Sequence, residues 1–127
     1  MSASHRLFVC TSCRLPGQER EPRAERGGAR LHRNLVERYG PWADREGIII
    51  APYECLSACA RPCAIALRAP GKFTYVFGDA TPGETESAII ECASLFRRKD
   101  AGFLPRDERP VALQAAILAR IPPLELG

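Results

Sequence analysis

The chain has 127 residues, the size of a single domain, and is long enough to bury a core without disulfide bonds. Hydrophobic residues make up 46% of the chain, which excludes an intrinsically disordered protein. The 18 Lys and Arg stand against 15 Asp and Glu, and a mixed formal charge of +3 gives no support to a nucleic-acid-binding protein.

The sequence shows no sign of a membrane or secreted protein. No apolar run approaches the roughly 20 residues that a membrane helix needs. Residues 1–6 lack the apolar stretch of a secretion signal. We therefore expect a cytoplasmic protein whose six cysteines stay reduced.

The first half of the chain predicts a strand, a helix and a second strand. Residues 5–9 end in an apolar run that is typical of a buried strand. After a polar loop, apolar residues recur at helical spacing from Leu31 to Tyr39, and we expect this helix to stop at Gly40-Pro41. Residues 48–51 are continuously apolar, as in a strand buried on both faces. Such a crossover predicts two parallel strands.

The second half predicts a hairpin and a helix. Residues 64–68 and 72–77 have the composition of strands, and Pro70-Gly71 between them is a turn pair, so we expect an antiparallel hairpin. Residues 81–84, Thr-Pro-Gly-Glu, have the pattern of a capping box. This pattern predicts a helix over 82–98 that is capped by its preceding threonine.

The C-terminal part predicts a linker and a last helix. From Pro110 onward, Val111, Ala115 and Leu118 are spaced as on one helical face. We therefore expect a domain over residues 1–102, with a C-terminal linker and helix over 103–127 packed on it. The resulting order is β-α-β-β-β-α plus a C-terminal helix around a small mixed sheet. This α/β order is the layout of thioredoxin-like proteins.

Five of the six cysteines gather in two short stretches. Cys10 and Cys13 follow the first expected strand, and Cys55, Cys59 and Cys63 follow the second. Because parallel neighbouring strands end at the same edge of a sheet, we expect the two stretches to meet. Four thiolates close a zinc site or hold a [2Fe–2S] cluster. The sequence therefore predicts a metal centre with these five cysteines as candidate ligands.

Cysteine spacing favours iron–sulfur over zinc. A zinc ribbon offers two Cys-x2-Cys pairs, whereas this chain offers one such pair and one Cys-x3-Cys-x3-Cys run. We therefore favour [2Fe–2S] and keep zinc in an interaction module as the alternative. A dithiol oxidoreductase using Cys10 and Cys13 is a third interpretation, although such a pair normally opens a helix and here precedes a polar loop.

Three further residues deserve separate interpretations. Arg14 and Arg61 adjoin the cysteine stretches, where they would stabilise an anionic cluster and steer an acidic partner, so they are candidate cofactor-binding residues. Cys92 lies on the apolar face of the helix expected over 82–98 and is interpreted as a core residue. No serine-histidine-aspartate set or phosphate loop can be built, so the sequence names no catalytic residue and does not favour an enzyme.

Residues Cys55-Leu56-Ser57-Ala58-Cys59 resemble the Cys-Leu-Gly-x-Cys signature of thioredoxin-like [2Fe–2S] ferredoxins. The resemblance implies that Cys10, Cys55 and Cys59 are ligands, position for position. Cys13 matches the second ligand only approximately, because its gap from Cys10 is shorter than is usual there. Cys63 departs from the pattern, which has a proline or a small residue. It either replaces Cys13 or is a spare thiol that permits ligand exchange.

Nearly the whole chain is also similar to a bacterial family of unknown function described as predicted metal-binding proteins. The shared stretches are residues 9–14, 55–63, 71–79 and 120–123. The resemblance implies metal binding and an association with cobalamin or other metal-cofactor pathways. We therefore expect a one-electron carrier or an accessory factor, with a redox or cofactor-biosynthesis protein as its partner. A homodimer is compatible with this fold.

Overall fold

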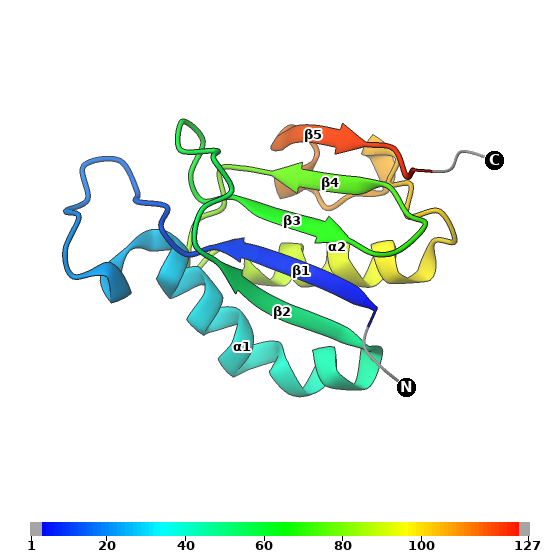
Figure 1. Cartoon of the computed structure of the whole chain (residues 1–127), viewed down its shortest axis with the longest axis horizontal. Coiled ribbons are helices and arrows are strands. Elements are labelled where there is room, and N and C mark those ends of the chain that lie inside the picture. The colour runs from blue at the N-terminus through cyan, green and yellow to red at the C-terminus, as the bar shows by residue number, and fades with distance from the viewer. Residues whose placement is uncertain (1–3, 125–127) are drawn as a thin grey trace.

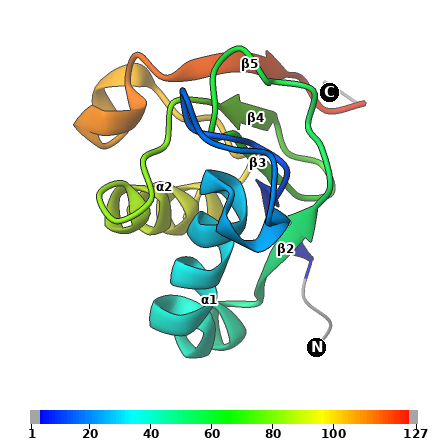
Figure 2. The same cartoon turned by 90° about the vertical axis from the view of Figure 1, so that its left-hand side faces the viewer.

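The computed structural model describes residues 4–124 as a five-stranded mixed sheet with two helices on one face (Figure 1, Figure 2). The strands are β1 (His5–Cys10), β2 (Ile48–Tyr53), β3 (Ile65–Arg68), β4 (Thr74–Phe77) and β5 (Ile117–Ile121). The helices are α1 (Gly27–Glu46) and α2 (Glu86–Arg98), with 3-10 turns η1 (Arg23–Glu25), η2 (Arg106–Glu108) and η3 (Val111–Leu113). The α/β class with a mixed sheet is the predicted one.

The sheet order is β2-β1-β3-β4-β5. β1 and β2 are parallel, as the strand-helix-strand pattern predicted, and β3 and β4 form the predicted antiparallel hairpin. The hairpin turns at Gly71, whose φ of +71° suits glycine. Because β1 and β2 run in the same direction, the loops that follow them leave the same end of the sheet (Figure 1).

α1 is longer than predicted. It continues through Gly40 and Pro41 to Glu46, and Gly47 ends it with a φ of +72°. Proline inside a helix removes one hydrogen bond and crowds the preceding turn. Here Ala43 is buried and Trp42 packs against the core, so burial of the last turns holds the helix together beyond the proline.

α2 starts later than predicted, and its cap is a different one. The helix begins at Glu86, so the expected capping by Thr81 and Glu84 is wrong. Instead, the Gly83 amide donates to the Glu86 carboxylate over 2.7 Å, and the Thr81 amide donates to the Thr85 hydroxyl over 2.9 Å. Asn34 of α1 also donates to the Glu86 carboxylate, over 2.8 Å. The buried Glu86 carboxylate therefore accepts hydrogen bonds from the turn before α2 and from α1, and so links the two helices.

The predicted C-terminal helix is wrong. Only η3 is helical there, and β5 follows as an edge strand antiparallel to β4. Val111, expected on the apolar face of the helix, is 84% exposed. A helix confined between Pro110 and Pro122 would be too short to be stable alone, whereas β4 offers a free row of backbone groups. The expected domain boundary at residue 102 stays a prediction.

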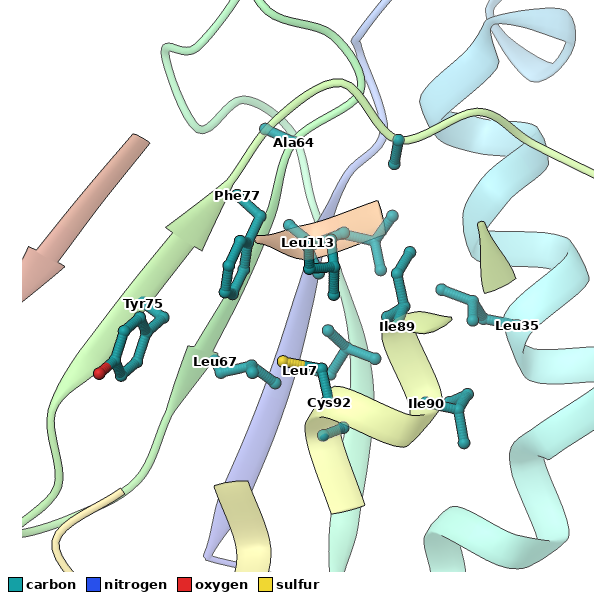
Figure 3. Close-up of a cluster of buried hydrophobic side chains, with 14 of the residues drawn as sticks. Leu7, Leu35, Ala64, Leu67, Tyr75, Phe77, Ile89, Ile90, Cys92 and Leu113 are labelled. Atoms are coloured by element: carbon teal, nitrogen blue, oxygen red, sulfur yellow. The ribbon is translucent and has the colours of Figure 1, made fainter. Parts of the chain in front are cut away.

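The core lies between the sheet and the two helices (Figure 3). Leu7 and Phe77 contribute from the sheet, and Leu35 and Ile89 from the helices, all fully buried. Cys92 belongs to the same cluster and is 0% exposed, which confirms that it is a core residue. Burial raises the pKa of its thiol to about 12. Among the described residues, no helix combines the length and apolar character needed to span a bilayer.

The first turn of α1 packs directly on the end of β1. A methyl group added at Gly28 would collide with the Cys10 carbonyl oxygen and would lie 3.3 Å from Cβ of Cys13. At Gly27 it would lie 2.7 Å from the Leu15 side chain and 3.0 Å from Sγ of Cys63. These two glycines therefore allow the helix to start among three cysteines.

Replacement of Gly28 by alanine tests this contact. We expect Gly28→Ala to lower the free energy of unfolding by about 1–3 kcal/mol. The new methyl group would overlap the Cys10 carbonyl, which belongs to an inner strand and cannot move away without disturbing the sheet. Gly40→Ala in the same helix is the control, since its nearest neighbour would be 4.0 Å away. It should be close to neutral, because the gain of about 1 kcal/mol in helix propensity is offset by crowding of the new methyl group against the ring of Pro41. Equal effects in urea unfolding would contradict the argument.

Candidate metal centre

The five clustered cysteines lie at one end of the sheet but differ in burial. Cys10, Cys13 and Cys63 are 1%, 3% and 0% exposed. Cys55 and Cys59 are exposed on the loop between β2 and β3. All are free thiols. The two stretches meet, as the parallel strands predicted, but as a buried group of three and an exposed pair.

The first stretch is fixed by the sheet and by α1. The Cys10 amide donates to the Ala64 carbonyl over 3.0 Å, and the Thr11 amide donates to the Tyr53 carbonyl over 2.9 Å. The Cys13 carbonyl accepts the Gly28 amide at 3.0 Å. Both thiols therefore sit on backbone that has little freedom to move.

The second stretch reaches the first through hydrogen bonds to sulfur. The Leu56 amide donates to Sγ of Cys10 over 3.4 Å, and the Ser57 amide donates to Sγ of Cys55 over 3.3 Å. Ser57 has a φ of +57°, in the left-handed region that few non-glycine residues adopt. Amides directed at sulfur stabilise thiolates, so this loop conformation suits metal-binding cysteines.

Cys63 is held differently from the other two cysteines of its stretch. Its amide donates to the Ala80 carbonyl over 3.2 Å, and its own carbonyl accepts the Ala80 amide at 3.1 Å. Its sulfur packs beside Gly27 at the start of α1. Cys63 is therefore part of the fixed interior, whereas Cys55 and Cys59 belong to an exposed loop.

The buried thiols influence one another. Interaction with the Cys13 thiol lowers the pKa of Cys10. The same interaction raises the pKa of Cys13, and burial raises it further. Burial raises the pKa of Cys63 to about 11, and the Arg30 charge opposes this increase. The first turn of α1 adds a positive dipole end that favours a thiolate. Sequence analysis missed Arg30, because helical spacing alone does not show that it lies near Cys63.

The two candidate arginines have different surroundings. Arg14 is exposed and lines a hollow of about 760 Å³ together with Cys13 and Cys59. Arg61 is half-buried, and its Nε donates to Asp79 over 2.9 Å. This bond raises the pKa of Arg61. Asp79 was not among the site residues predicted from the sequence, because its pairing with Arg61 arises only in the fold.

A second hollow, of about 460 Å³, lies beside the other exposed cysteine. Cys55, Ser12 and Tyr53 line it, together with Arg23 and Arg26. Ser12 also lines the hollow at Cys59, so it borders both hollows. Solvent-accessible space is therefore present next to both members of the exposed pair.

The donor set suits a thiolate-bound metal in its chemistry and location. Within residues 4–124, no three His, Cys, Asp or Glu side chains converge closely enough to hold a metal ion in this conformation. The thiols of Cys55 and Cys59 do not meet those of Cys10 and Cys13, because the first pair is exposed on a loop while the second pair is held on fixed backbone. A metal held by both stretches would require the exposed loop to bring its thiols to the buried pair.

The fold is similar to that of solved iron–sulfur proteins. A thioredoxin-like [2Fe–2S] ferredoxin from Aquifex aeolicus aligns with 98% of this chain and 100% of its own, at 20% identity and a TM-score of 0.59. A second crystal structure, of the wild-type thioredoxin-like [2Fe–2S] ferredoxin from Aquifex aeolicus, aligns over 93% and 99% at 16% identity and a TM-score of 0.56. These similarities confirm the thioredoxin-like fold class.

Comparison of the sequence with protein families gives a more direct assignment. No curated protein matches the chain. Residues 7–123 match the family DUF1636, whose description is protein of unknown function. The match includes both cysteine stretches, β5 and every helix. The chain therefore belongs to the DUF1636 family, and its fold is that of a thioredoxin-like ferredoxin.

Proposed function

We propose that the protein binds a [2Fe–2S] cluster through Cys10, Cys13, Cys55 and Cys59 and works as a one-electron carrier. The main support is the hydrogen bond from the Leu56 amide to Sγ of Cys10, which joins the two cysteine stretches. The similarity in fold to proteins named [2Fe–2S] ferredoxins adds to it. Such a cluster, when bound, accepts and releases single electrons.

In this proposal Cys63 is not a ligand. Its backbone is paired with Ala80 on both sides, and its side chain packs toward the start of α1. Cys13 lies on the same short stretch as Cys10, and its interaction with Cys10 lowers the pKa of that thiol, so Cys13 completes the set more easily. Cys63 would then remain a buried thiol near the ligands, and burial raises its pKa to about 11.

The proposed role requires a protein partner. A redox protein or an enzyme of metal-cofactor synthesis would dock at the exposed cysteine loop, because Cys55 and Cys59 lie at the surface there. Arg14 would lie beside the docked partner and favour an acidic surface on it. A homodimer is compatible with the proposal, and so is a cytoplasmic location.

A dithiol oxidoreductase is the second candidate. The hydrogen bond from Cys13 lowers the pKa of Cys10, which is what a nucleophilic thiol requires. Both thiols, however, are at most 3% exposed, so a protein substrate cannot reach them without an opening of the exposed loop. Zinc in place of the cluster is an alternative outcome of the first experiment below.

Anaerobic purification followed by an absorption spectrum and metal analysis tests the proposal. We expect a brown protein with about two iron atoms and two inorganic sulfides per chain and with reversible one-electron reduction. A colourless protein with about one zinc would replace the electron carrier with a zinc-stabilised module. A folded, metal-free protein that reduces disulfides would instead support the dithiol candidate.

Serine substitutions test the ligand assignment. Cys10→Ser, Cys13→Ser, Cys55→Ser and Cys59→Ser should each lose most of the bound iron, because serine replaces a soft thiolate by a hard alcohol. Cys63→Ser is the matched control and should keep its iron and visible spectrum. Circular dichroism would verify that each variant folds. If Cys63→Ser lost its iron and Cys13→Ser retained it, Cys63 and not Cys13 would be the fourth ligand.

Differential alkylation tests the same set without substitutions. In metal-free protein, Cys55 and Cys59 should react first with iodoacetamide, because the other four thiols are buried. Metal loading should slow the reaction of the exposed pair strongly and leave Cys92 unreactive in both states. Mass spectrometry of digested peptides identifies the modified residues. Equal reactivity of Cys55 and Cys59 before and after loading would show that they bind no metal.

A further inference from the structure

The end of the sheet opposite the cysteines carries two arginines that directly face each other. Arg6 of β1 and Arg68 of β3 are partners in the antiparallel register, so their side chains leave the same face of the sheet. This face is the one that the two helices leave uncovered, because the alternate residues Leu7 and Leu67 point into the core (Figure 2, Figure 3). Both arginines are exposed.

The pair has no carboxylate to balance it in the part of the chain that the structure describes. Neither guanidinium forms a salt bridge within residues 4–124. Like charges directly opposite each other on neighbouring strands are destabilising. Two guanidinium groups side by side are, however, well suited to bind one phosphate or carboxylate group through paired hydrogen bonds.

A hollow surrounds this pair. It has a volume of about 900 Å³, within the range of small-molecule sites in proteins. Phe8, Thr74, Pro122 and Pro123 line it together with Arg6 and Arg68. The site therefore combines two cations with an apolar surface large enough for an organic group.

Lys72 also lines the hollow, but its charge is directed away from it. Its ammonium donates to the Phe96 and Arg97 carbonyls over 2.9 and 3.1 Å, so it is held toward the C-terminal end of α2. The ammonium also lies over the ring of Phe96, a core residue on the helical side of the sheet, so the positive charge of the hollow comes from the two arginines.

We propose that this hollow binds a small organic anion. The phosphate or carboxylate of the ligand would lie between Arg6 and Arg68, and its organic part would lie against Phe8 and the Pro122-Pro123 wall. Only two arginines present their charge to the hollow, and the whole chain is nearly balanced in charge, so a nucleic-acid backbone is not the expected ligand. The site lies at the far end of β1 from Cys10 and is independent of the proposed cluster (Figure 1).

Titration with three probes at constant ionic strength tests the proposal. Phenyl phosphate, benzoate and inorganic phosphate would be added to the full chain while the melting temperature and the amide NMR spectrum are recorded. We expect saturable shifts at Arg6, Phe8 and Arg68, with tighter binding of an aromatic probe than of inorganic phosphate. The stronger aromatic probe identifies the acid group as phosphate or carboxylate.

Single substitutions assign the binding to the arginine pair. Arg6→Gln and Arg68→Gln should each lower the affinity for the best probe by about tenfold or more, since hydrogen bonds between charged groups are lost. Arg45→Gln, at an exposed arginine near the end of α1, is the control and should bind normally. Without a probe, Arg68→Gln should melt no lower than the unsubstituted chain, because it removes the like-charge contact.

Two results would overturn the proposal. The first is unchanged binding in both Arg6→Gln and Arg68→Gln. The second is a full chain that responds to no probe. In that case Glu125→Gln decides whether the chain supplies its own anion, because Leu124 lines the hollow and Glu125 follows it. Probe binding by Glu125→Gln alone would show that the hollow is an internal contact and not a ligand site.

Discussion

The cysteine end of the molecule depends on the close approach of α1 to the end of β1. Gly28 has no side chain, so its amide reaches the Cys13 carbonyl and its Cα lies against the Cys10 carbonyl. This contact places the positive end of the helix dipole next to the buried thiols. Any chemistry that develops negative charge on these sulfurs, whether metal binding or thiol exchange, is favoured by this arrangement.

The division of the cysteines into a fixed set and an exposed pair has an energetic consequence. Cys10, Cys13 and Cys63 are positioned by strand pairing and by α1, so their order comes with the fold itself. Cys55 and Cys59 belong to an exposed loop and would be ordered by the ligand. Metal binding commonly supplies such ordering free energy. In the proposed metal site, this division would let the exposed pair close on a metal that the fixed cysteines already position.

The elements that sequence analysis predicted correctly are the ones whose signals are local. The apolar run of β1 and the Pro70-Gly71 turn each determine a conformation with few distant contacts. The errors concern segments that distant packing decides. β5 forms because β4 has a free edge, and α1 passes Pro41 because Ala43 is buried. The meeting of the two cysteine stretches was predictable because the parallel order of β1 and β2 is a topological rule.

Details of the two proposed sites could not be predicted from the sequence, because they depend on strand register and on turn conformation. The facing of Arg6 and Arg68 follows from the pairing of β1 with β3, which no local pattern indicates. Ser57 is a similar case. It stands where the ferredoxin signature has glycine, and its backbone adopts the left-handed conformation that glycine adopts without strain. A serine there costs more than glycine, yet its amide still reaches Sγ of Cys55. The loop thus has a backbone geometry that directs an amide at the sulfur, although serine and not glycine occupies the left-handed position.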